Sequence, residues 1–256
     1  MILYHAPSSY YSMIARLALL EAGLAFDQQM MDIHFAQQQN ASWYVAINPN
    51  MTVPCLAGEG IHLTDSRDIL QFAAQSAGAT WMDGEPSAAA LIAATVEGHY
   101  RMSIESLTFT RLMNRIWPLR VLFPRALARI NRKLQAGLSS ASDPEAVRGK
   151  IALNTERMAY FTQGDLRQKL QVQRDRVVAY LRTLPAPQPF LFGERMSSAD
   201  VVVAVLLGRL RMIGEEALFA DLAGLGLWFE MMQSRDAFAR ADIWVRFQPL
   251  RIFLRR

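Results

Sequence analysis

The feature that most limits the fold of this chain is a change of sequence pattern near residue 80. Before it, short apolar runs typical of strands alternate with runs whose apolar residues follow a helical spacing. The expected order is a strand at 2–4, a helix at 13–20, a strand at 26–33, a helix at 42–47, strands at 53–57 and 61–64, and a helix at 69–78. This order predicts a compact α/β domain of about eighty residues.

After residue 88 helical periodicity dominates, so the rest of the chain is expected to be all-α. The sequence therefore predicts a first domain at 1–80, a linker at 81–87 and an all-α domain at 88–256. A chain of 256 residues is long enough to bury two cores. One helix start is well marked, because Ser197 precedes Asp200 by three residues and the pair can form a capping box.

Composition excludes several classes of protein. An apolar content of 52% rules out a disordered chain, and a net charge of +4 without an aromatic-interleaved basic patch gives no reason to expect nucleic acid as a partner. The longest apolar run, 201–207, is too short to span a bilayer. The single cysteine, Cys55, excludes internal disulfides and cysteine-rich metal sites. We expect a cytoplasmic protein with no integral membrane segment and no metal.

Pro7 to Ser12 form a hydroxyl-rich turn between the first strand and the first helix. The start of a helix presents unpaired backbone N–H groups and the positive end of the helix dipole, so an anion is stabilised there without a cation. We hypothesise that this anion is a thiolate. Lowering a thiol pKa by two units takes about 2.7 kcal/mol, and one hydrogen bond to a charge supplies about 1.5–3 kcal/mol.

Two further features follow along the chain. Pro54 interrupts a strand pattern and marks an edge, bulge or turn; a trans bond is the common case, whereas a cis bond would turn the backbone of Val53 outward. Asp65 and Ser66 precede a helix. The pattern predicts a helix N-cap, and the alternative interpretation is a binding site for a ligand carboxylate at the helix start.

In this order, the hydroxyl turn, Asn48–Pro49, Val53–Pro54 before a hairpin and Asp65–Ser66 before a helix resemble the glutathione transferase family. The capping box at Ser197–Asp200 is also similar to that family's. The resemblance covers most of the chain and is weakest between 102 and 173. It implies the glutathione transferase fold, an α/β thioredoxin-like N-terminal domain followed by an all-α helical C-terminal domain with the substrate pocket.

The resemblance assigns roles around glutathione as co-substrate. Val53 would pair through its backbone with the cysteinyl part, beside a cis Pro54. Asp65 and Ser66 would hold the γ-glutamyl end. The hydroxyl that assists the thiolate falls at Ser9, where the family's serine classes place theirs.

Ser12 is the rival of Ser9, because some bacterial β-aryl etherases of the family align their serine there, and Tyr11 is a lesser catalytic candidate. A small aromatic electrophile is the implied second partner. The side chains expected to line its pocket are Tyr10, Tyr11, Tyr100, Met102 and Phe109. The family also implies a homodimer.

Parts of the chain look similar to two groups of bacterial enzymes that attack aromatic compounds with glutathione. The stretch 197–210 together with Ser12–Met13 and Arg16–Leu17 is similar to tetrachlorohydroquinone dehalogenases, and 47–54 to β-aryl etherases. The resemblance therefore implies aromatic compound degradation. The dehalogenases have a reactive cysteine where this chain has Tyr11, so we expect ether cleavage or a displacement that leaves a thioether.

Two alternatives remain at this point. One is a glutathione-dependent cis-trans isomerase of the maleylacetoacetate type, whose serine also falls at Ser9 but whose next two residues are Ser-Cys instead of Tyr10–Tyr11. The other is a non-catalytic binding protein with this fold.

A basic stretch in the second half has no role in these hypotheses. Its members are Arg111, Arg115, Arg120, Arg125, Arg129, Arg132 and Lys133. A solvated helix face is the simpler interpretation, and the alternative is a positive rim that attracts carboxylated aromatic substrates or the carboxylates of glutathione.

Overall fold

The computed structural model describes residues 1–141, 143–222, 224–248 and 251. The chain divides into two compact units. The first unit consists of residues 1–30, 53–104 and 174–256, and the second of residues 31–52 and 105–173. The linker expected at 81–87 stays a prediction.

A four-stranded sheet lies in the first unit. Its strands are β1 (Ile2–His5), β2 (Asp27–Met30), β3 (Cys55–Gly58) and β4 (Ile61–Leu63), in the order β2-β1-β3-β4. β1 and β2 are parallel, whereas β3 is antiparallel to both β1 and β4. The predicted hairpin around Gly58–Gly60 is thus present, and the strand expected at 26–33 is shorter than its pattern indicated.

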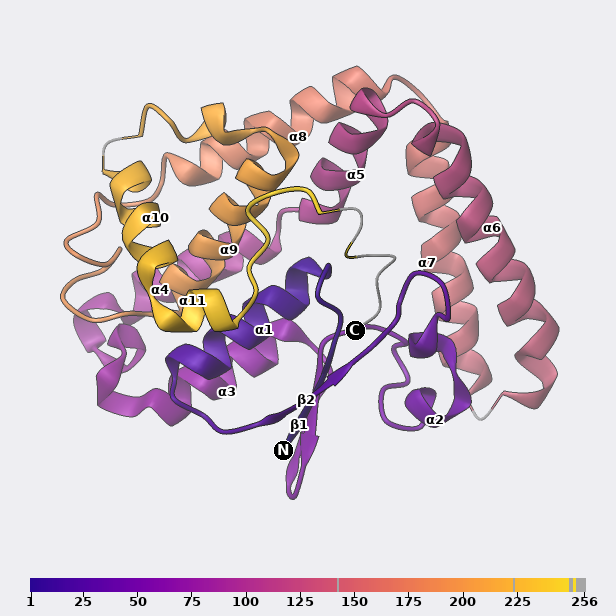
Figure 1. Ribbon diagram of the computed structural model, residues 1–256, viewed down its shortest axis with the longest axis horizontal. Coiled ribbons are helices and arrows are strands. Elements are labelled where there is room, and N and C mark those ends of the chain that lie inside the picture. The colour runs from indigo at the N-terminus through magenta and orange to yellow at the C-terminus, as the bar shows by residue number, and fades with distance from the viewer. Residues whose placement is uncertain (142, 223, 249–250, 252–256) are drawn as a thin grey trace. The chain divides into compact units, whose positions relative to one another are not determined.

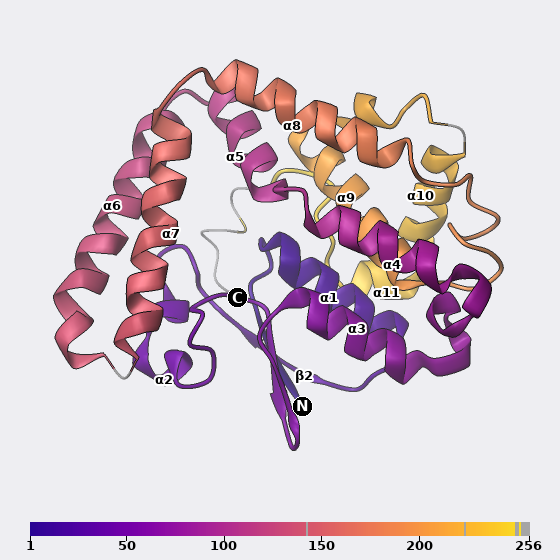
Figure 2. The ribbon, with the colours of Figure 1, turned by 180° about the vertical axis from the view of Figure 1, so that it is seen from behind.

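The α-helices of the first unit are α1 (Tyr10–Glu21), α3 (Ser66–Ala77), α4 (Pro86–Tyr100), α9 (Ser198–Ile213), α10 (Leu225–Ser234) and α11 (Asp236–Arg240). Short 3-10 turns lie at Gly78–Thr80, Met82–Gly84 and Glu216–Leu218. α1 and α3 pack side by side (Figures 1 and 2). Every residue of α9 except Arg211 is buried, because this mostly apolar helix packs against both α1 and α4; its charged residues Asp200 and Arg209 are buried with it.

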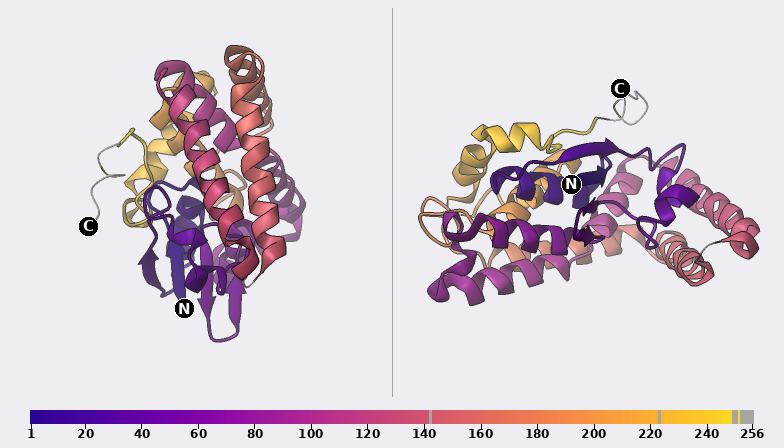
Figure 3. Two further views of the ribbon diagram at one scale, coloured as in Figure 1. Left: turned by 90° about the vertical axis from the view of Figure 1, so that its right-hand side faces the viewer. Right: turned by 90° about the horizontal axis from the view of Figure 1, so that it is seen from below.

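The second unit is helical. It holds α2 (Ser42–Val45), nearly all of α5 (Ile104–Arg115), α6 (Leu119–Gly137), α7 (Pro144–Thr162), the first half of α8 (Leu166–Leu181) and 3-10 turns at Gln38–Asn40 and Leu138–Ser140. α6 and α7 lie side by side as a long hairpin (Figure 3). Asn154, buried between them, donates to the side chain of Asn131 at 2.9 Å.

An α/β first part followed by helices is the fold class that the sequence predicted, and that prediction is confirmed. Within the part of the chain that the structure describes, no helix combines the length and the apolar character needed to cross a membrane.

The predicted capping box is present at the start of α9. The fully buried carboxylate of Asp200 accepts from the N–H of Ser197 at 2.9 Å and from the hydroxyl of Ser197 at 2.6 Å. Its other oxygen accepts from the N–H of Leu191 at 2.9 Å. Burial raises the pKa of Asp200 to about 6, although each of these bonds favours the charged form.

We expect Asp200→Ala to lower the free energy of unfolding by about 3 kcal/mol or more, because three buried donors lose their acceptor. Chemical denaturation at pH 7.5 measures this loss. Asp236→Ala is the control, since the Asp236 side chain is 81% exposed and ends in a surface ion pair. Equal losses of unfolding free energy in the two variants would contradict the proposed contribution of the capping box to stability.

Candidate functional site

Three segments that the sequence singled out meet at one end of the sheet. The register pairs Tyr4 with Cys55 and Leu56 with Leu63. Because β3 runs antiparallel to its neighbours, the chain leaves β1, enters β3 and leaves β4 at the same end. The turn at 6–9, the pair Val53–Pro54 and the start of α3 therefore lie at that end.

Ser9 is the N-cap residue of α1. Its backbone is extended, with φ −72° and ψ 124°, and its hydroxyl oxygen accepts from the N–H of Ser12 at 3.3 Å. This bond uses a lone pair of the oxygen and not the hydroxyl proton, so the proton can be donated to another group. The residue is half-buried. Ser9 therefore combines a helix start, access to solvent and a hydroxyl donor.

Ser12 has a different environment. It is fully buried, and its hydroxyl oxygen accepts from the N–H of Ala6 at 3.3 Å. The side chain thus fastens the first turn of α1 to the end of β1. Its hydroxyl is closed to solvent, whereas Ser9 is half-buried.

Two buried arginines hold the backbone just before Ser9. Arg16 is 1% exposed and donates to the carbonyl oxygens of Ala6 at 3.3 Å and of Pro7 at 3.4 Å. Arg209 is 7% exposed and donates to the carbonyl oxygen of Ser8 at 3.2 Å. Three consecutive carbonyl groups are thus fixed by two guanidinium groups.

Arg16 also reaches the C-terminal part of the first unit. It donates to the carbonyl oxygens of Ala241 at 2.6 Å and of Asp242 at 3.3 Å, and to Nδ1 of His5 at 2.9 Å. Because a guanidinium only donates, Nδ1 of His5 must be the acceptor. Burial lowers the pKa of His5 to about 3, which keeps its ring neutral.

Tyr10 points into the interior. It is 4% exposed, its hydroxyl lies 3.2 Å from Nε2 of His99, and the guanidinium of Arg209 lies 5.3 Å from its ring centroid. Burial raises the pKa of Tyr10 and lowers that of His99 to about 3, so both are neutral near pH 7. The expected place of Tyr10 in a substrate pocket stays a prediction.

A chain of contacts joins the start of α1 to the start of α3. The ring of Tyr11 stacks on that of Tyr100 with 6.3 Å between centroids, and the Tyr100 hydroxyl lies 3.0 Å from that of Ser66. Arg67 covers the same Tyr100 ring at 4.8 Å. Tyr11 and Tyr100 are half-buried, so they form a wall beside the end of the sheet.

The remaining segments at this end have the expected local form. The Val53–Pro54 peptide bond is cis, Pro54 is buried and Val53 is half-buried. Asp65 caps α3 by accepting from the N–H of Arg67 at 2.8 Å, and Ser66 is 2% exposed. The roles of these residues in glutathione binding stay predictions.

The last two predicted pocket residues, Met102 and Phe109, belong to different units of the chain. Met102 is 7% exposed in the first unit. Phe109 belongs to the second unit, where its ring stacks on that of Phe123 with 4.5 Å between centroids.

The chain offers no reactive thiol of its own at this site. Cys55 is fully buried in β3, and burial raises the pKa of its thiol to about 11. Over the described ranges, no three His, Cys, Asp or Glu side chains are grouped so that they could hold a metal ion.

Sequence reasoning missed Arg16 and Arg209. Both lie within otherwise apolar helix patterns, Arg16 in 13–20 and Arg209 after 201–207. A charged residue on an apolar helix face is the signal that could have found them, because such a residue is buried only with partners.

Two family models match the chain. The N-terminal domain of glutathione S-transferase matches residues 3–81, and the C-terminal domain matches residues 164–230, together more than half of the chain. A curated relative, the tetrachloro-p-hydroquinone reductive dehalogenase of Sphingobium chlorophenolicum, is 25% identical over 94% of this chain and 95% of its own length.

Solved structures share the fold. A glutathione transferase from Populus trichocarpa has a TM-score of 0.61 at 20% identity, covering 96% of this chain and 99% of its own. The glutathione S-transferase from Xylella fastidiosa has a TM-score of 0.58 at 22% identity, covering 94% and 96%. The chain therefore belongs to the glutathione S-transferase family.

Proposed function

We propose that this protein is a glutathione-dependent enzyme in which the hydroxyl of Ser9 stabilises the glutathione thiolate for attack on an electrophilic, aromatic substrate. The observation that carries the proposal is the hydrogen bond of Ser9, which accepts from Ser12 N–H and leaves the hydroxyl proton for a thiolate. The N-terminus of a twelve-residue helix adds its dipole at the same place.

The buried charges of Arg16 and Arg209 would also stabilise a thiolate at Ser9. Their charges lie within the protein on the carbonyl groups before Ser9, and they are too deeply buried to bind the ligand themselves. A fixed positive charge in a low-dielectric interior favours an anion at the adjacent surface. A rigid turn also keeps the Ser9 hydroxyl in one orientation, so that little reorganisation is needed when the thiolate forms.

The reaction is a displacement at carbon. The thiolate sulphur forms a bond to the aromatic or benzylic carbon, and the leaving group, a halide or a phenolate, departs with the electron pair of the broken bond. The product is a thioether. The similarity to a reductive dehalogenase suggests the class of substrate. Tyr11 has no thiol where the dehalogenases have a reactive cysteine, and burial raises the pKa of the Cys55 thiol. We therefore favour a reaction that ends at the thioether or cleaves an ether.

Glutathione would bind along the end of the sheet where the three segments meet. In the proposed arrangement the backbone of Val53 pairs with the cysteinyl part, next to the cis Pro54, and Asp65 and Ser66 receive the γ-glutamyl end. The stacked Tyr11 and Tyr100 would form the side of the site that faces the aromatic substrate.

A homodimer is the proposed assembly, and a groove of about 510 Å³ between α3 and α4 is its proposed interface. Small and apolar residues such as Ala74, Ile92 and Ala93 line the groove. At its rim Arg67 and Glu97 form an ion pair of 3.0 Å. A twofold axis would place this largely apolar surface against the same surface of a second copy of the chain.

Ser9→Ala is expected to raise the thiol pKa of bound glutathione by about 1–2 units, the equivalent of one hydrogen bond to a charge. The ultraviolet absorbance of the thiolate, followed against pH, measures this pKa. Ser12→Ala is the comparison variant: it removes a hydroxyl that is bonded inside the protein, and it is expected to raise the thiol pKa less than Ser9→Ala does. The reverse result, with the effect on Ser12→Ala only, would transfer the role to Ser12.

Ala93→Glu is expected to convert a dimer into a monomer, because it places a charge in the apolar groove between α3 and α4. Sedimentation equilibrium measures the mass in solution. Ala94→Glu is the matched control: Ala94 is exposed on the same helix but does not line the groove. A monomeric wild type, or a dimeric Ala93→Glu variant, would contradict this interface.

A further inference from the structure

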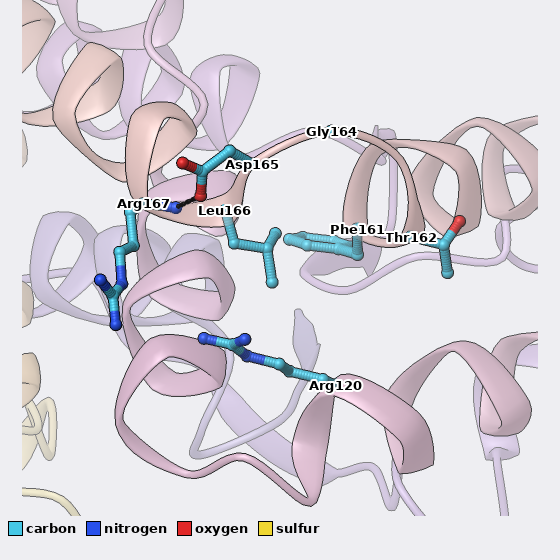
Figure 4. Close-up of a pocket in the computed structure, with 7 residues that line it drawn as sticks. All are labelled: Arg120, Phe161, Thr162, Gly164, Asp165, Leu166 and Arg167. Atoms are coloured by element: carbon cyan, nitrogen blue, oxygen red, sulfur yellow. Dashed lines mark hydrogen bonds between the residues drawn. The ribbon is translucent and has the colours of Figure 1, made fainter.

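A cavity lies in the second unit. It has a volume of about 540 Å³ and is formed where α6 begins and where α7 passes into α8 (Figure 4). The lining residues are Arg120, Phe161, Thr162, Gly164, Asp165, Leu166 and Arg167. Its volume is in the range of cavities that bind small molecules.

One wall of this cavity is apolar. Phe161 and Leu166 are 6% and 9% exposed, and their side chains point toward each other above Arg120 (Figure 4). Phe161 is held by edge contacts with Phe123 at 5.4 Å and with Phe109 at 6.1 Å between centroids. These contacts hold Phe161 in place, so that it and Leu166 give the cavity a fixed apolar side.

The opposite side is cationic and partly preorganised. The guanidinium of Arg120 donates through Nε to the carbonyl oxygen of Met113 at 2.9 Å and through Nη2 to the side chain of Asn114 at 3.2 Å. Asn114 in turn donates to the carbonyl oxygen of Leu166 at 3.0 Å, which ties this network to the apolar wall. These bonds of Arg120 use two of its five N–H donors.

Most of the other charges around the cavity are positive and favour an anion. Arg167 is exposed and lines the same cavity. Lys169 donates to the carbonyl oxygens of Tyr160 and Gln163 beside Gly164. Asp165 is the acidic residue among those that line the cavity, and its carboxylate, which accepts from the N–H of Arg167 at 2.8 Å, opposes the two guanidinium groups. The sequence between Glu105 and Asp143 holds no acidic residue.

We propose that this cavity is a binding site for an aromatic carboxylate, with the carboxylate held between Arg120 and Arg167 and the ring against Phe161 and Leu166. A guanidinium matches a carboxylate through two parallel hydrogen bonds, and the apolar wall buries the ring. This site shares no residue with the proposed glutathione site and gives part of the arginine-rich stretch a function in ligand binding.

The test is equilibrium binding of 2-naphthoate to the full chain in the absence of glutathione, measured by calorimetry. We expect Arg120→Gln to weaken binding about tenfold or more and Arg167→Gln to weaken it by a smaller factor. Arg129→Gln is the matched control, since Arg129 is exposed on the same helix and does not line the cavity. It should bind 2-naphthoate as the wild type does.

A neutral analogue, 2-naphthylmethanol, separates charge recognition from apolar contact, and we expect it to bind at least tenfold more weakly than 2-naphthoate. If Arg120→Gln fails to fold, Arg167→Gln decides the question, because its side chain is exposed and its loss spares the Asn114 network. Equal affinities of the Arg167 and Arg129 variants, or no binding of 2-naphthoate by the wild type, would overturn the proposal. Because glutathione is absent, neither result depends on the proposed enzyme activity.

Discussion

The buried guanidinium of Arg16 is the interaction on which the candidate site depends. All five of its N–H donors have acceptors: four carbonyl oxygens and one imidazole nitrogen. These acceptors come from the end of β1, from the turn before Ser9 and from the segment after α11. A single side chain thus joins parts of the first unit that are more than two hundred residues apart in sequence, and its burial is tolerated because each donor is satisfied.

The arrangement of the site follows from the connections of the sheet. A parallel β1–β2 pair needs the α1 crossover, and two antiparallel pairs bring β3 and β4 back across the sheet. The segments that follow β1 and β4 and precede β3 are therefore neighbours at one end. The tyrosines then connect two of these segments, because Tyr100 of α4 contacts both Tyr11 and Ser66. Strand order places the segments, and side chains from the helices fix their spacing.

The local pattern of the sequence was sufficient for most of the first unit. The hairpin, the Asp65 cap and the box at Ser197–Asp200 are short-range features, in which the residues that interact are at most a few positions apart. The Tyr10–His99 pair and the bonds of Arg16 could not be predicted in this way, because their partners are set by tertiary packing. The same limit applies to the cavity at Arg120, which is formed by residues more than forty positions apart in sequence.

The environment of the two serines shows how structure refines a hypothesis that the sequence leaves open. Ser9 and Ser12 are both hydroxyls in the same turn, and helix spacing alone does not separate them. Their acceptor bonds do: Ser12 receives the N–H of Ala6 inside the protein, whereas Ser9 receives the N–H of Ser12 at the surface. The buried serine stabilises the turn, and that stability holds the other hydroxyl at the helix start.

The anion binding that we propose for the two units would depend on different physical means. At Ser9 the arginines are bonded to carbonyl oxygens of the backbone, so a bound anion would contact a hydroxyl and a helix terminus and would interact with the charges only through the protein. At the cavity of the second unit the guanidinium groups of Arg120 and Arg167 are exposed and would touch the ligand directly. Salt screens exposed charges much more than buried ones. An anion at the second cavity should therefore lose affinity with rising ionic strength, whereas the field behind Ser9 persists.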